Sequence, residues 1–146
     1  MDVLLEMHGE FYYWEYALGA LQAANHPRVG INYNSDPRDL VDDSVAFVLD
    51  KVGDRIRHVH LHDLADREYP YRELLDALRA RDYPGYLSLE LGYSGGDPEG
   101  IIQFYGGMLD LITTETASIT IALAPSAEAC TMMFEIKAVP GTDMEI

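Results

Sequence analysis

Short apolar stretches alternate with longer amphipathic stretches over the first 112 residues of the chain. The short stretches are rich in β-branched and aromatic residues, whereas the long ones repeat apolar residues at three- and four-residue steps. This alternation is typical of βα units around a parallel sheet, so the fold class we predict is α/β. The expected strands cover residues 3–5, 28–33, 56–61 and 86–91, and the expected helices cover 12–24, 37–52, 71–81 and 98–112.

The βα rhythm is lost after Glu115. Residues 119–123 and 132–139 have the composition of strands, and no stretch long enough for a helix separates them. We therefore divide the chain into a βα region, residues 1–115, and a C-terminal β-rich tail, residues 116–146. The tail is a hairpin annex, the beginning of another domain, or a segment foreign to the βα region, and its role stays open.

Polar residues with metal-binding chemistry stand at the carboxyl end of each predicted strand. They are Glu6, Asn34, His60 and Glu90, separated by 28, 26 and 30 residues. Because the carboxyl ends of parallel strands open on one face, equivalent positions in successive units converge there. Two carboxylates, an imidazole and an amide oxygen suit Mn²⁺, Co²⁺, Mg²⁺ or Zn²⁺ better than a copper or iron–sulfur centre.

Four segments of the chain resemble one known family. Residues 4–9, 30–34, 57–63 and 85–90 are similar to the last four strand motifs of the xylose isomerase-like TIM barrels. That group includes sugar phosphate isomerases and epimerases, hydroxypyruvate isomerase, inosose dehydratase and the endonuclease IV branch. The resemblance covers residues 1–112 and implies a partial (β/α)₈ TIM barrel, namely strands five to eight.

The resemblance also implies roles for individual residues. Glu6 and Glu90 would be the catalytic pair and would both bind the metal, with His60 as a third ligand. One glutamate would take a proton from the carbon next to a carbonyl and the other would return it. Asn34 stands where the family usually has an aspartate ligand, and Asp36 is a possible substitute.

Three further residues are expected to contact the substrate. His8 follows Glu6 by two positions, and His62 and Asp63 follow the third strand. His62 stands where the family commonly has a lysine. The resemblance implies a small sugar or sugar phosphate as substrate, and leaves isomerisation, epimerisation and dehydration open, because all three begin with the same proton abstraction.

Charge and composition limit the partners. Ten Lys and Arg residues against 25 Asp and Glu residues give a formal charge of −15, which repels nucleic acid and anionic membranes. This disfavours the alternative of an endonuclease IV-like phosphodiesterase. The single cysteine, Cys130, cannot form an internal disulfide. The sequence has neither an apolar run of membrane-spanning length nor a basic signal-peptide start, so we expect a cytoplasmic location.

Length is the main departure from the family. The chain has 146 residues, whereas a closed (β/α)₈ barrel typically has about 250. Half a barrel has open sheet edges, so we expect a homodimer of two halves or a missing N-terminal half, truncation being the simpler reading. A non-catalytic half-barrel remnant is the remaining alternative.

Overall fold

Strands and helices alternate along the βα region, as predicted. The computed structural model describes residues 1–92, 96–113, 117–123 and 131–138, the last two ranges by their backbone alone. The order is β1 (Val3–Glu6), α1 (Trp14–Ala24), β2 (Val29–Asn34), α2 (Ala46–Val52), β3 (Ile56–Leu61), α3 (Tyr71–Ala80), β4 (Tyr86–Glu90) and α4 (Pro98–Thr113). Short 3₁₀ turns precede α1, α2 and β3 at Gly9–Tyr12, Pro37–Asp39 and Gly53–Arg55.

The first four strands form a parallel sheet in sequence order. β1 pairs with β2, β2 with β3 and β3 with β4, all in parallel. β5 (Ala117–Leu123) and β6 (Thr131–Ala138) extend the same sheet, with β6 antiparallel to β4 and β5 antiparallel to β6. The remaining residues of the predicted tail lie outside the described residues. The strand order β1-β2-β3-β4-β6-β5 leaves β1 and β5 at the two edges of the described sheet.

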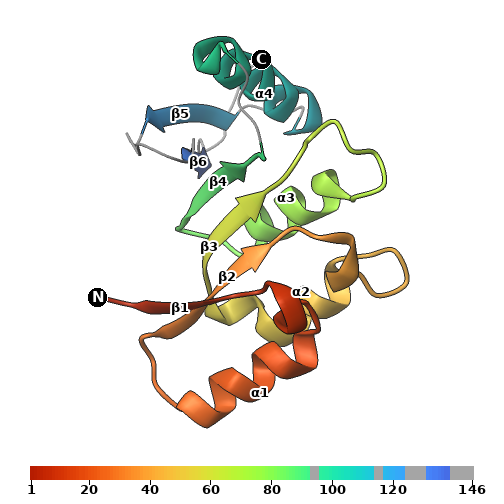
Figure 1. Cartoon of the computed structure of the whole chain (residues 1–146), viewed down its shortest axis with the longest axis vertical. Coiled ribbons are helices and arrows are strands. Elements are labelled where there is room, and N and C mark those ends of the chain that lie inside the picture. Colours follow the sequence, from red (N-terminus) through yellow and green to blue (C-terminus); the bar gives the residue numbers. More distant parts are fainter. Residues whose placement is uncertain (93–95, 114–116, 124–130, 139–146) are drawn as a thin grey trace, which may run out of the picture.

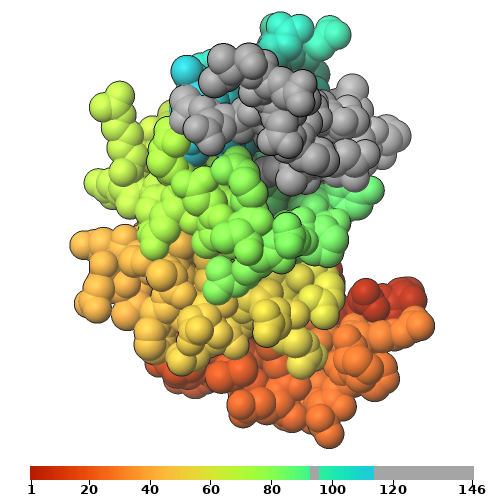
Figure 2. Space-filling view, turned by 180° about the vertical axis from the view of Figure 1, so that it is seen from behind, coloured from red at the N-terminus to blue at the C-terminus, as the bar shows by residue number. Residues whose placement is uncertain are grey.

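The helices cover one face of the parallel strands, which is where the core lies. Successive helices follow the strands from α1 to α4 (Figure 1), and from behind the βα units appear as stacked bands (Figure 2). Because strand residues alternate between faces, the odd-numbered positions point into this core. Those buried positions are Ile31, Tyr33, Val59, Leu61, Leu87 and Leu89. From Asn32, His58 and Ser88 to the strand ends, the even-numbered positions carry polar side chains on the opposite face.

The second helix begins later than its capping signal predicts. Asp36 does cap a helical start at Pro37, but that start is only a 3₁₀ turn that ends at Asp39. Asp42 and Asp43 then adopt positive φ angles of 54° and 59°, which a helix does not tolerate. The expectation of one helix over 37–52 is therefore wrong, and α2 occupies only its last seven residues.

A contact from a distant part of the chain fixes the start of α2. The carboxylate of Glu73, on α3, accepts hydrogen bonds from Ser44 Oγ at 2.5 Å and from the Val45 N–H at 3.4 Å. These bonds satisfy a donor at the helix N-terminus, which otherwise lacks a partner.

Among the helices of the described ranges, none combines the length and apolar character that crossing a bilayer requires.

Candidate metal centre

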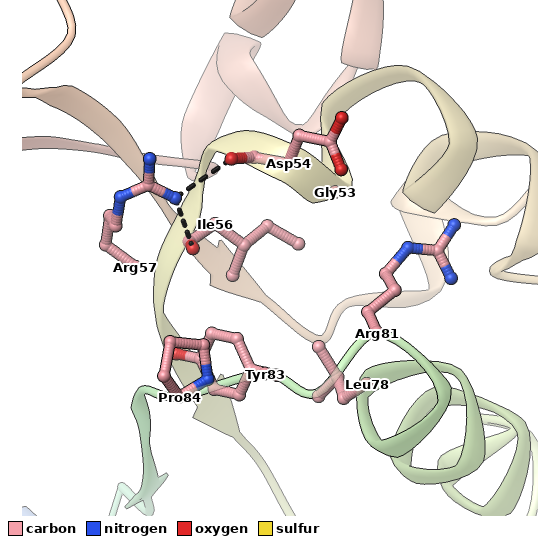
Figure 3. Close-up of a pocket in the computed structure, with 8 residues that line it drawn as sticks. All are labelled: Gly53, Asp54, Ile56, Arg57, Leu78, Arg81, Tyr83 and Pro84. Carbon is pink, nitrogen blue, oxygen red and sulfur yellow. Dashed lines mark hydrogen bonds between the residues drawn. The ribbon is translucent and has the colours of Figure 1, made fainter.

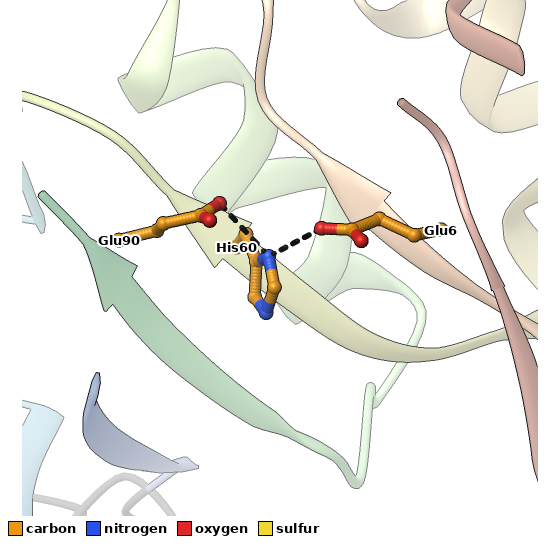
Figure 4. A group of neighbouring side chains, drawn as sticks. All are labelled: Glu6, His60 and Glu90. Atoms are coloured by element: carbon orange, nitrogen blue, oxygen red, sulfur yellow. Dashed lines mark ion pairs between the residues drawn. The ribbon is translucent and has the colours of Figure 1, made fainter. Parts of the chain in front are cut away.

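Three predicted ligands meet on the polar face of the sheet. His60 Nδ1 lies 3.1 Å from Glu6 Oε1 and 3.1 Å from Glu90 Oε2. One ligand atom from each residue can be chosen so that all three lie within 4.8 Å of one another. Figure 4 shows the two glutamates approaching His60 from opposite sides. Since the three residues come from β1, β3 and β4, the fold itself assembles the group.

The two glutamates reach His60 across the sheet. β1 and β4 are separated by two strands, which places their backbones about 14 Å apart in a flat sheet. Both carboxylates reach the same imidazole nitrogen, on the strand β3 that lies between them. Glu6 and Glu90 therefore project from the face of the sheet opposite to the helices and lean toward β3.

The donor set fits a divalent cation. Two ligands that lie about 2.1 Å from a metal and at right angles to each other are about 3.0 Å apart. The distances from His60 Nδ1 to the oxygens of Glu6 and Glu90 are both 3.1 Å. Without a cation, a single Nδ1 proton can satisfy only one of the two carboxylates at a time. A divalent cation would accept electron pairs from all three groups and would neutralise both negative charges.

Exposure of the group decreases from its mouth to its floor. The side chains of Glu6 and Glu90 are 42% and 49% exposed, whereas that of His60 is 19% exposed. The carboxylates are thus accessible to a small molecule, whereas the imidazole is largely buried. This is the gradient that a site open to substrate on one side requires.

Several polar atoms at the carboxyl ends of the strands lack partners. The amide oxygen of Asn32, both amide atoms of Asn34 and Nε2 of His62 are buried and lack hydrogen-bond partners among the described residues. Buried polar groups are usually satisfied, so these atoms call for water or a ligand. Of these residues Asn32 lies against His60, so its unpartnered oxygen also favours a bound group beside the imidazole.

No hydrogen bond joins Asn34 to the three-residue group in the described part of the structure. Asn34 ends β2, lies opposite His60 in the strand register and is fully buried. The substitute ligand, Asp36, is engaged elsewhere: its carboxylate forms two hydrogen bonds with the Arg38 guanidinium, at 2.7 and 2.9 Å. These bonds from Arg38 lower the pKa of Asp36. Asp36 is thereby tied to the 3₁₀ turn that it caps.

Asn32 is the residue that sequence reasoning missed. Its amide nitrogen lies 3.1 Å from His60 Nε2 and 3.3 Å from His60 Nδ1. Strand alternation was the available signal, because Asn32 precedes Asn34 by two residues and shares its face. Asn32 also lies opposite Glu6 in the pairing of β1 with β2.

The three predicted substrate contacts have different surroundings. His8 is exposed, and its ring lies against that of Tyr12 with centroids 5.3 Å apart. His62 is half-buried, and its backbone N–H donates to Ser35 Oγ. Asp63 accepts a hydrogen bond of 2.8 Å from the hydroxyl of Tyr105 on α4. The carboxylate of Asp63 therefore joins the loop after β3 to α4.

A buried carboxyl group supports the loop that follows β2. Asp39 is 2% exposed, and the Tyr69 hydroxyl lies 3.3 and 3.4 Å from its two oxygens. Tyr69 also bonds the hydroxyl of Tyr33 at 3.0 Å. Burial raises the pKa of Asp39 to about 7, while hydrogen bonds from Tyr33, Asp36 and Tyr69 limit the rise. This carboxyl group thus titrates near neutral pH.

A hollow of about 290 Å³ lies at the opposite end of the strands. It is located before β3 and β4, with Ile56, Leu78 and Tyr83 among its lining residues (Figure 3). Arg57, at its rim, donates hydrogen bonds to the carbonyl oxygens of Asp54 and Ile56. The hollow is therefore separate from the Glu6–His60–Glu90 group, which lies toward the carboxyl ends.

Comparison with known proteins identifies no relative. No protein-family model matches the chain. No curated protein has significant similarity to it. The function is therefore inferred from the geometry of the Glu6–His60–Glu90 group.

Proposed function

We propose that the chain is a metal-dependent sugar or sugar-phosphate isomerase or epimerase, and that Glu6, His60 and Glu90 form its metal centre. The observation that carries the proposal is the convergence of these three side chains from three strands. Two carboxylates beside one cation site can act as the base and the acid that move a proton between neighbouring carbons.

The finer part of the fold belongs to the same proposal. We interpret the four βα units as half of a (β/α)₈ barrel, in agreement with the resemblance of residues 1–112. The position of the site at the strands' carboxyl ends supports this interpretation. Completion of the barrel by a second half would surround the open mouth of the site.

The chemistry divides between the two glutamates. One carboxylate removes the proton from the carbon next to the substrate carbonyl, and the electron pair moves to the carbonyl oxygen to give an enediolate. For isomerisation, the other glutamate in its acid form delivers a proton to the neighbouring carbon, and the hydroxyl proton on the first carbon passes to the former carbonyl oxygen. For epimerisation, it delivers the proton to the opposite face of the same carbon. When bound, the cation would supply Lewis acidity, which polarises the carbonyl and stabilises the developing negative charge.

The proton transfer itself provides the test. The protein is incubated with Mn²⁺ and a panel of aldoses, ketoses and their phosphates in D₂O, and proton NMR monitors the carbon-bound hydrogen next to the carbonyl. We expect that hydrogen to exchange with deuterium for at least one substrate. Replacement of the glutamate that accepts this proton, by Glu6→Gln or Glu90→Gln, should abolish the exchange, because an amide cannot accept the proton.

Glu99→Gln is the matched control. Glu99 is exposed in the first turn of α4, so the same chemical change there should leave exchange unaltered. Exchange that persists in both Glu6→Gln and Glu90→Gln would refute the catalytic roles. Metal binding without exchange on any sugar would instead support a non-catalytic half-barrel.

A further inference from the structure

Asn32 occupies the floor of the metal centre beside His60. It is 8% exposed, and its amide nitrogen lies 3.1 Å from Nε2 of the imidazole and 3.3 Å from Nδ1. Nδ1 also lies 3.1 Å from a carboxylate oxygen of each glutamate. Asn32 is therefore slightly nearer the ring nitrogen that does not face the carboxylates.

The tautomer of His60 determines whether the site can bind a cation. A neutral imidazole carries one proton, and only the nitrogen without it has an electron pair for a metal. Because Nδ1 is the nitrogen beside Glu6 and Glu90, it is the one that must be unprotonated. The proton then lies on Nε2, which needs a hydrogen-bond acceptor in its half-buried position.

The Asn32 side chain can serve both tautomers. In the orientation described, Nδ2 faces Nε2, and the amide oxygen is buried without a hydrogen-bond partner among the described residues. This arrangement suits an imidazole with its proton on Nδ1 and an electron pair on Nε2. A half-turn of the amide exchanges its oxygen and nitrogen, so that the oxygen accepts the Nε2 proton and the amide nitrogen takes the position that the oxygen had.

We infer that Asn32 is a positioning residue that holds the proton of His60 on Nε2 and so keeps the Nδ1 electron pair free for the cation. The inference depends on the proposed metal centre and adds to it a residue outside the ligand set. Partners of this kind orient metal-binding histidines and typically change metal affinity by about 10- to 100-fold. An amide also performs this task without adding a third negative charge to Glu6 and Glu90.

The tautomer is measured by ¹⁵N NMR of the histidine side chains, with Zn²⁺ as a diamagnetic probe. His60 is assigned by comparison with His60→Gln. In the Zn²⁺-bound wild-type protein we expect a protonated Nε2 and a metal-bound Nδ1. A spectrum with the proton on Nδ1, or with zinc on Nε2, would overturn the role of Asn32 but leave the metal centre in place.

Variants at position 32 test the same role by calorimetric titration with Zn²⁺. Asn32→Leu has the same branching but no acceptor, so its dissociation constant should rise about 10- to 100-fold. Asn32→Asp retains the acceptor and should bind at least as tightly as the wild type. Ser88→Ala is the matched control: Ser88 lies opposite His60 in the pairing of β3 with β4, but among the described residues its hydroxyl bonds His58, at 2.7 Å, and forms no hydrogen bond with His60.

The outcomes separate this inference from the proposed function. Equal affinities of Asn32→Leu and the wild type would overturn the inference alone, as would an equal loss in Ser88→Ala. A wild-type protein that binds no Zn²⁺ would refute the metal centre, and the role of Asn32 with it. Circular dichroism of each variant identifies any loss of fold, and the wild-type NMR result does not depend on the variants.

Discussion

Replacement of Asp39 by asparagine should change how stability depends on pH. The carboxyl group is buried between Tyr33, Tyr69 and the Asp36 backbone, and its pKa is raised from 3.8 to about 7. A raised carboxyl pKa means that the folded protein retains a proton that the unfolded chain releases. The associated stability is therefore complete below about pH 4 and is lost as pH rises toward 7.

The magnitude follows from the shift. About three pKa units correspond to about 4 kcal/mol over the whole range, and about 3 kcal/mol of this loss falls between pH 5 and pH 8. Asparagine resembles the protonated carboxyl group in shape and has no charge to bury. The unfolding free energy of Asp39→Asn, relative to the wild type, should thus increase by about 3 kcal/mol from pH 5 to pH 8.

Urea unfolding at pH 5, 6, 7 and 8 measures this difference. The fluorescence of Trp14 reports the transition, because this single tryptophan packs edge-on against Phe47 of α2. Asp43→Asn is the control, since it removes a carboxylate from an exposed position of the same loop. A difference between Asp39→Asn and wild type that does not vary with pH would refute the reasoning.

Three substitutions test the packing that positions the strands, each by urea unfolding. Glu73→Ala removes the hydrogen bonds at the start of α2 and should cost about 1–2 kcal/mol; an unchanged midpoint would mean that these bonds do not stabilise the helix. Gly30→Ala would place a Cβ 2.9 Å from the carbonyl oxygen of Arg55, which should cost about 1–3 kcal/mol. A stabilised variant would contradict that contact. Leu74→Ala empties a fully buried position on α3 and should cost about 2–5 kcal/mol, so a loss below about 1 kcal/mol would contradict its place in the core.

The strands could be predicted because their signal is local. Alternation of apolar residues and the flanking turn residues define each strand within a few positions, and β3 has the predicted bounds, Ile56–Leu61. The start of α2 could not be found in this way. Its N-terminus is satisfied by Glu73, from a later helix, while Asp42 and Asp43 interrupt the helix that Asp36 and Pro37 begin.

The candidate site was predictable only in part, for a related reason. Strand ends identified Glu6, His60 and Glu90, and the structure brings these three together. The contact between Asn32 and the imidazole depends on side-chain direction, which residue spacing does not specify. Both share the polar face, yet it is the amide of Asn32 that contacts the imidazole.

Titration of the chelator-treated protein with Mn²⁺ tests the metal centre most directly. Electron paramagnetic resonance measures free Mn²⁺, and we expect the wild-type protein to remove about one equivalent per chain before the free signal increases. The Glu6→Gln/Glu90→Gln double variant should lose this site, while weak binding by the other acidic residues of this chain remains. Identical titration curves for the two proteins would contradict the existence of a Glu6–His60–Glu90 metal centre.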